Sequence, residues 1–307
     1  MKNHIYIIFF LFTVIATAQE EFISSEIKIN DLISGTLLTP SDKTEKLAIL
    51  IPGSGPTDRN GNQQMMQNNS LKKLAEALSK EGIATFRYDK RIFSLAKQNA
   101  LKEEDINFDD FVDDAEAVIS FFKEKGYSDI TLIGHSQGAL VAELAAKDIA
   151  ITKLVSLAGA GKSIDQLILD QLEKQAPALR ENAEQAFNDL KKTGKAEKFS
   201  PGLFSFLRPS IQPFMLSWML YDPAEVLKGL DIPILIITGS KDLQVPEGEG
   251  ELLANANPDA EYIQIKNMNH VLKEIEGDDL ENSKAYNESF RPVIPQLITE
   301  IADFIKK

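Results

Sequence analysis

A serine flanked by two glycines is the feature of this sequence with the clearest chemical meaning. Residues 134–138 read Gly-His-Ser-Gln-Gly, after an apolar run at 130–133 and before a helix-forming run at 139–147. A serine on a sharp strand-to-helix turn holds its hydroxyl clear of the backbone, and the small flanking residues let strand and helix pass closely. The helix start presents N–H groups to developing negative charge. The pattern predicts Ser136 as a nucleophile; the competing interpretation is a tight turn without chemistry.

A serine hydroxyl is a poor nucleophile without an adjacent general base, and the chain offers three histidines for that role. His4 lies in an N-terminal segment that we expect to be removed. His135 neighbours the serine within the turn, where its side chain is expected to point away from the hydroxyl. His270 remains, on a loop directly after the last predicted strand, residues 261–265. A lone loop histidine is more often a plain surface residue, but elimination favours His270 as the base.

The base in turn needs a carboxylate that holds its tautomer. Asp242 follows the predicted strand that ends at residue 238, which places it one strand before His270. The strand at 153–157 is followed by Ala-Gly-Ala-Gly and offers no acid, and Glu247 lies beyond a proline. Taken alone, Asp242 is equally well explained as a turn-forming residue. The chain order of serine, acid and histidine favours Asp242 as the third member.

An oxyanion formed at the serine needs two N–H donors. One is expected from Gln137, directly after the nucleophile. The other is expected from the glycine-rich loop at residues 51–62, where we assign Ser54, with Gly55 as the alternative. The acidic and amide residues at 58–62 do not make a calcium loop, because the required glycine and glutamate are missing. The loop also lacks the Gly-Lys-Ser/Thr of a phosphate-binding loop.

Apolar runs and helical spacing alternate along the chain, which predicts an α/β fold with a mostly parallel central sheet flanked by helices. Continuous apolar runs suit buried parallel strands. We expect strands at 22–29, 33–38, 47–51, 83–88, 130–133, 153–157, 233–238 and 261–265, and helices at 70–80, 108–125, 139–147 and 296–305.

The stretch from 162 to 230 breaks this alternation, because it holds helical runs and no convincing strand. We interpret it as a helical cap inserted into a core formed by residues 19–161 and 231–307. Three aromatic residues of the cap are candidates for binding the acyl part of a substrate, or equally for the cap's own core: Phe206, Phe214 and Trp218.

Composition excludes several classes of protein and site. The 307 residues include 33 Lys plus Arg and 46 Asp plus Glu, for a net charge of −13, and no cysteine. An acidic chain without a basic stripe argues against nucleic-acid binding and against docking on anionic lipid. Without cysteine there is no disulfide, no cysteine nucleophile and no thiolate-bound metal. With three histidines a multi-histidine metal site is hard to build, so we expect no metal.

Residues 1–18 have the three parts of a secretory signal peptide. Lys2 supplies positive charge, residues 5–15 are almost wholly apolar, and Ala16-Thr17-Ala18 is a small-residue cleavage signature. The apolar run is too short for a spanning helix. We expect cleavage after Ala18, export to the periplasm or the medium, and no stable membrane span afterwards. The alternative is an uncleaved N-terminal anchor.

Five motifs carry a resemblance to a known family, and they lie at 51–62, 86–91, 134–138, 221–224 and 239–242. By these motifs the chain, from about residue 46 to the C-terminus, resembles the α/β-hydrolase superfamily, and more narrowly bacterial carboxylesterases related to serine aminopeptidase-like hydrolases. The resemblance implies a Ser136, Asp242 and His270 triad, oxyanion donors at Ser54 and Gln137, a helical cap and activity on short acyl esters. Relatives often continue the Asp-Lys-Arg of the 86–91 motif with a glycine-rich turn, whereas this chain has Ile-Phe-Ser at 92–94.

The residues together predict two-step acyl transfer from a small-molecule ester, with no metal or organic cofactor. Two other functions stay open. A peptidase on short peptides would use the same triad and would need a carboxylate for the peptide's amino terminus, for which Asp165 or Glu173 of the cap is a candidate. A non-catalytic α/β binding protein is the third hypothesis.

Overall fold

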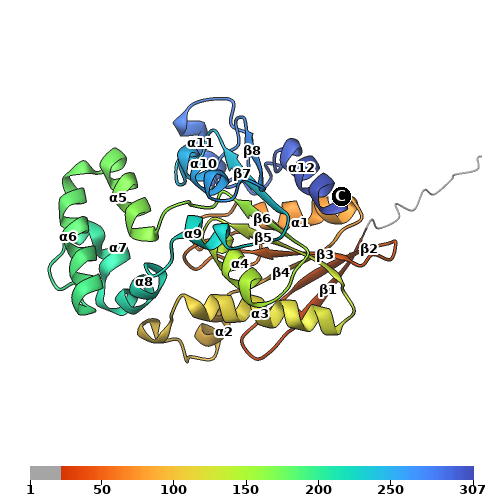
Figure 1. The fold of residues 1–307 in the computed structure, drawn as a ribbon, viewed down its shortest axis with the longest axis horizontal. Coiled ribbons are helices and arrows are strands. Elements are labelled where there is room, and N and C mark those ends of the chain that lie inside the picture. Colours follow the sequence, from red (N-terminus) through yellow and green to blue (C-terminus); the bar gives the residue numbers. More distant parts are fainter. Residues whose placement is uncertain (1–21) are drawn as a thin grey trace, which may run out of the picture.

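The computed structural model describes residues 22–307 and contains one eight-stranded sheet in the order β1-β2-β4-β3-β5-β6-β7-β8 (Figure 1). β2 runs antiparallel to both its neighbours, and the pairs from β4 onward are parallel. This confirms the predicted mostly parallel sheet. The strands are β1 (Phe22–Lys28), β2 (Ser34–Pro40), β3 (Lys46–Ile51), β4 (Ala84–Tyr88), β5 (Asp129–His135), β6 (Lys153–Leu157), β7 (Ile234–Gly239) and β8 (Glu261–Ile265).

Helices cover both faces of the sheet, and the alternation of side chains along the strands sends each apolar residue to one face or the other. In β3, Leu47 and Ile49 join the apolar cluster under α3, α4, α9 and α10, whereas Ala48 and Leu50 join the cluster under α1 and α12. These helices are α1 (Ser70–Lys80), α3 (Asp109–Glu124), α4 (Gln137–Asp148), α9 (Pro223–Lys228), α10 (Glu247–Ala256) and α12 (Pro295–Lys306).

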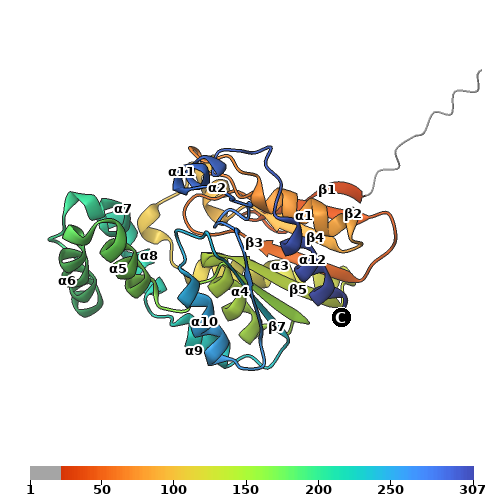
Figure 2. The same ribbon diagram turned by 90° about the horizontal axis from the view of Figure 1, so that it is seen from above.

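A group of helices between β6 and β7 lies beside the sheet rather than on it (Figures 1 and 2). It has its own apolar cluster, built from residues such as Leu169, Phe187 and Leu203. Residues 162–230 contain no strand, as predicted, although Val226 and Leu227 of α9 belong to the cluster under the sheet. The cap helices are α5 (Ile164–Gln175), α6 (Pro177–Thr193), α7 (Phe204–Leu207) and α8 (Gln212–Trp218).

Several short elements were not predicted from the sequence. α10 begins Glu-Gly-Glu-Gly, a poor helix former, and buries Leu253 against the sheet. α2 has seven residues and buries none of them fully; only Ile92 and Leu95 pack partly against the core, which is too short a pattern to predict a helix. α1 begins at Ser70 as predicted, and Asn69 occupies the cap position before it at φ 54°. The other elements are α2 (Arg91–Lys97), α11 (Asp279–Ala285), and the 3₁₀ turns η1 (Glu103–Asp105), η2 (Pro201–Leu203) and η3 (Pro209–Ile211).

The predicted signal peptide, residues 1–18, lies outside the described residues. Within residues 22–307 no helix has both the length and the apolar character that crossing a membrane requires.

A buried acid lies behind the helix that follows Ser136. Glu143 of α4 is fully buried, and its Oε1 accepts a hydrogen bond of 3.1 Å from Ser156 Oγ on β6. Its Oε2 has no partner among the described residues. Burial raises the pKa of Glu143 from 4.5 to about 8, so the side chain is a neutral carboxylic acid at pH 7.

This protonation state makes stability depend on pH. Between pH 4.5 and 8 the native state holds a proton that the unfolded chain releases, so the free energy of unfolding falls as pH rises through this range. Glu143→Gln keeps the shape and the acceptor for Ser156 but removes the titration. We expect it to raise the Tm at pH 8, by on the order of 5 °C, and by less at pH 5. Thermal unfolding at both pH values tests this, with Glu124→Gln on the exposed face of α3 as control. Equal shifts at both pH values would contradict it.

Candidate active site

The turn between β5 and α4 holds Ser136 in an unusual backbone conformation. Its φ of 56° and ψ of −122° are unfavourable for a residue with a side chain. Its N–H donates to Leu157 O at 2.9 Å. A Cβ added at Gly134 would lie 2.2 Å from Gly138 O, and one added at Gly138 would lie 2.4 Å from Ile51 O. Strand, helix and the neighbouring loop therefore cross with no room for a side chain, as the glycine spacing predicted.

His270 and Asp242 meet across the ends of the last two strands. His270 Nδ1 is 2.8 Å from Asp242 Oδ2, and both side chains are buried. The other oxygen, Asp242 Oδ1, accepts the N–H groups of Gln244 at 2.8 Å and Val245 at 2.9 Å. The carboxylate is thus fixed by backbone donors on one side and accepts a hydrogen bond from His270 Nδ1–H on the other. This tautomer leaves His270 Nε2 as the nitrogen that can accept a proton.

His135 takes part in the site in a way that the sequence did not indicate. Its Nε2 is 2.8 Å from His270 O, and the centroids of the His135 and His270 rings are 4.9 Å apart. Burial lowers the pKa of His135 to about 3, so the ring is neutral and its Nε2–H must be the donor to this carbonyl. His135 therefore holds the backbone of His270. In residues 22–307 no hydrogen bond joins Ser136 Oγ to His270, so their direct contact stays a prediction.

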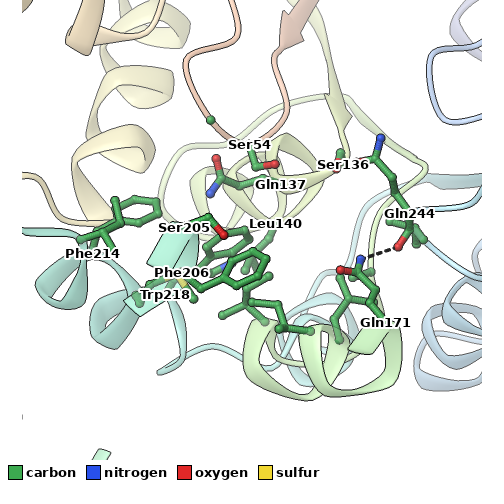
Figure 3. Close-up of a pocket in the computed structure, with 18 of the residues that line it drawn as sticks. Ser54, Ser136, Gln137, Leu140, Gln171, Ser205, Phe206, Phe214, Trp218 and Gln244 are labelled. Carbon is green, nitrogen blue, oxygen red and sulfur yellow. Dashed lines mark hydrogen bonds between the residues drawn. The ribbon is translucent and has the colours of Figure 1, made fainter. Parts of the chain in front are cut away.

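The expected oxyanion donors lie beside the serine. A Cβ added at Gly53 would lie 3.2 Å from Ser136 Cβ, which shows how closely the loop after β3 approaches. Ser54 and Gln137 line one cavity together with Ser136 (Figure 3). Neither the Ser54 N–H nor the Gln137 N–H donates a hydrogen bond to another described residue. Both N–H groups are thus available to an oxyanion; for Gln137 this is normal, because its N–H lies in the first turn of α4.

The cavity between the sheet and the cap measures about 510 Å³. Asp242 and His270 do not line it, but Gln244 and Val245, which hold Asp242, do. No aspartate or glutamate lines it among the described residues. Its two cations are paired, Lys162 with Asp170 and Arg208 with Glu103. The remaining lining is mostly apolar: Leu140, Ile164, Leu167, Ile168, Phe206, Ile211, Phe214, Met215, Trp218 and Val245.

The three aromatic residues singled out in the cap all line this cavity (Figure 3). Phe214 and Trp218 also pack against the core. The Trp218 ring stacks on Phe108 with centroids 5.5 Å apart, and the Phe214 ring meets Phe111 at 5.7 Å. Phe206 has no ring contact of this kind in the described residues. The two interpretations offered for these residues, cavity wall and cap packing, therefore coexist at Phe214 and Trp218.

One further contact joins the cap to the loop between β7 and α10 that carries Asp242, which we call the acid loop. Gln171 of α5 lines the cavity, and its Nε2 donates to Gln244 O at 2.6 Å (Figure 3). A glutamine on an amphipathic helix carries no sequence signal for such a contact. The acid loop is thus held from the cap side as well as from the core.

A family model described as serine aminopeptidase, S33, matches residues 66–200. Esterase EstD of Thermotoga maritima is 28% identical over 265 residues, which make up 84% of this chain and 62% of that protein. The chain therefore spans less than two thirds of the length of this curated relative.

Solved structures share the fold at low sequence identity. Est1E from Butyrivibrio proteoclasticus has a TM-score of 0.57 at 18% identity, with 92% of this chain and 99% of that chain covered. A Pyrococcus furiosus esterase has a TM-score of 0.55 at 16% identity, covering 93% and 91%. Proline iminopeptidase from Mycobacterium smegmatis has a TM-score of 0.56 at 14% identity, covering 92% and 98%.

The glycine crossing yields a stability prediction. Gly134→Ala and Gly138→Ala place a methyl group against fixed backbone atoms, so we expect each to lower the free energy of unfolding by more than about 3 kcal/mol. The control is Gly248→Ala in α10, where an added Cβ meets nothing within 4 Å and alanine favours the helix by up to about 1 kcal/mol. Chemical denaturation of the three variants measures this. Unchanged stability in Gly134→Ala and Gly138→Ala would refute the crossing.

Proposed function

We propose that the chain is a serine hydrolase of the α/β-hydrolase superfamily that cleaves carboxylic esters of small molecules. The observation that carries the proposal is the strained Ser136 on the wall of a largely apolar cavity, one residue from an imidazole that holds His270, itself paired with Asp242. The similarity to EstD and to two solved esterases supports an ester as the substrate.

The proposed reaction has two steps. His270 Nε2 takes the Ser136 proton as Oγ attacks the ester carbonyl, and Asp242 stabilises the imidazolium. The N–H groups of Ser54 and Gln137 bind the oxyanion, and loss of one such donor typically lowers the rate by about 10²–10³. The intermediate collapses, and the leaving alcohol takes the proton from His270. Water, deprotonated by His270, then attacks the acyl-enzyme and releases the acid and the free serine.

The substrate class follows from the cavity. A mostly apolar space of about 510 Å³ suits a short to medium acyl group and rejects a large polymer. Phe206, Phe214 and Trp218 are proposed to contact that acyl group. The proposal includes export through residues 1–18.

We expect a fluorophosphonate probe to label the protein and Ser136→Ala to abolish both labelling and hydrolysis of p-nitrophenyl esters. Another serine serves as control. Ser205 lines the same cavity, and Ser205→Ala should keep kcat within about threefold of the wild type. A series of acyl lengths should show a KM minimum and then a rise as the chain exceeds the cavity. Labelling that persists in Ser136→Ala would overturn the assignment of the nucleophile, and no labelling of the wild type would favour the binding-protein hypothesis.

The second candidate is a peptidase on short peptides, which the family model and the proline iminopeptidase fold neighbour favour. Such an enzyme needs an anionic group for the amino terminus, and neither carboxylate considered for this role lines the cavity. Asp165 is buried in the cap and pairs with Lys191 at 2.6 Å, and Glu173 pairs with Arg180 at 3.0 Å.

We therefore expect kcat/KM for p-nitrophenyl butyrate to exceed that for alanine p-nitroanilide by at least about 10³. The physical reason is that the anilide would bring a cationic amino group into a cavity without a carboxylate partner, and burying such a charge is unfavourable. Assay of both substrates on one enzyme preparation measures the ratio. A kcat/KM for the aminoacyl anilide equal to or above that for the ester would establish the peptidase instead.

A further inference from the structure

A buried lysine lies directly behind the loop that carries Ser54. Lys90 follows β4, and 5% of its surface is exposed. Its Nζ donates to Gly53 O through a short hydrogen bond, to Gly55 O at 3.1 Å and to Gln137 Oε1 at 3.2 Å. Three acceptors match the three protons of an ammonium group. This one side chain thus joins the loop after β3 to the residue after the nucleophile.

The hydrogen bond to Gly53 O bears directly on the Ser54 N–H, because the two belong to one peptide unit. A trans peptide directs its C=O and N–H in opposite directions, and the described chain has no cis bond. An ammonium that holds Gly53 O from behind therefore fixes the direction of the Ser54 N–H. It also polarises the peptide, which strengthens that N–H as a donor. The bond to Gln137 Oε1 anchors the residue that supplies the second N–H.

Within residues 22–307 no carboxylate pairs with the Lys90 ammonium. On α3, Asp114 borders the same small void as Lys90, but its oxygens take Arg91 Nε at 2.9 Å and Nη2 at 2.8 Å. The adjacent Asp89 is bound by Arg59.

The other groups around Lys90 leave its charge unbalanced as well. Tyr88 borders the void and is uncharged because burial raises its pKa, His135 on β5 is neutral, and Phe111 offers its ring 5.1 Å from Nζ. Burial lowers the pKa of Lys90 to about 7. Holding an unpaired ammonium in such a place is unfavourable for stability, which indicates a role that offsets it.

We propose that Lys90 is the positioning residue of the oxyanion hole: its ammonium group aligns the Ser54 and Gln137 N–H donors and places positive charge behind them. The inference rests on the proposed function, because an oxyanion hole has meaning only for an acyl-transfer site. Lys90 is not among the residues that line the cavity, and none of its hydrogen bonds goes to Ser136. It acts through the peptide unit of Gly53 and Ser54 and through Gln137, and its effect is on the transition state rather than on substrate binding.

The protonation of Lys90 gives the proposal a pH signature. Its pKa is depressed to about 7, so the ammonium is intact below that pH and is lost as pH rises through it. The neutral amine keeps two protons for three acceptors and carries no charge. We therefore expect kcat to decline above pH 7, by at least about threefold by pH 9. Arginine stays charged throughout and should remove this decline.

The test compares Lys90→Met, Lys90→Arg and a matched control, using p-nitrophenyl butyrate from pH 5.5 to 9. The control is Lys153→Met. Lys153 is another buried lysine, with Nζ 2.8 Å from Ile305 O and 5.9 Å from the Phe304 ring centre, but it begins β6 at the far end of the sheet. At pH 6 we expect Lys90→Met to lower kcat by about 10- to 100-fold with KM within about threefold, and Lys153→Met to leave kcat within about twofold.

Binding of phenylboronic acid, which forms a tetrahedral adduct with the serine, gives an independent readout. Its affinity should fall in Lys90→Met by the same factor as kcat. Lys90→Arg should retain part of the affinity and part of kcat, and its kcat should not decline above pH 7. The inference would be overturned if Lys90→Met and Lys153→Met lowered kcat equally. It would also be overturned if kcat of Lys90→Arg declined above pH 7 as much as kcat of the wild type. If Lys90→Met does not fold, the pH profile of Lys90→Arg still decides. Wild-type turnover that Ser136→Ala abolishes establishes the proposed function separately, so each idea can fail alone.

Discussion

The crossing of backbones at Gly134 and Gly138 is the constraint on which the rest of the site depends. β5, α4 and the end of β3 approach so closely that any Cβ at these two positions would overlap backbone atoms. Ser136, caught between them, adopts a conformation that costs about 1–3 kcal/mol for a residue with a side chain. The strain persists because the Ser136 N–H is bonded to Leu157 and α4 is almost wholly buried. The fold thereby stores strain at the residue that we propose as the nucleophile.

Parallel pairing brings the other parts to the same edge of the sheet. Ile51 pairs with Gly134, and Gly239 pairs with Ile265, so the loops that follow these strands start level with one another. The loops that carry Asp242 and His270 are also joined by a backbone hydrogen bond, because Lys241 N donates to Met268 O at 2.9 Å. His135 and His270, which are far apart in the sequence, therefore meet at this edge without any local sequence preference for doing so. The contact between Asp242 and His270 is a consequence of strand order.

The sequence predicted those features that depend on local pattern or on elimination. Apolar runs located the strands, and glycine spacing located Ser136. The roles of His135 and Lys90 were not predictable, because each depends on burial of a polar side chain by segments distant in the chain. Their setting explains the 86–91 motif, which carried the family resemblance without assigned chemistry. Asp89 and Lys90 of the 86–91 motif both reach back to the 51–62 loop, the first through Arg59 and the second through Gly53 and Gly55.

The cap is connected to the acid–base pair as well as to the cavity, which limits how it can change. Gln171 binds Gln244 O, and the N–H of the same Gln244 binds Asp242. At the root of the cap, Glu249 accepts the N–H groups of Gly161 at 2.9 Å and Lys162 at 3.0 Å. A chain of hydrogen bonds thus runs from α5 through Gln244 to the carboxylate that pairs with His270. Gln171 lines the cavity and also holds the loop of Asp242, so a change at this position of α5 bears both on the shape of the cavity and on the support of Asp242.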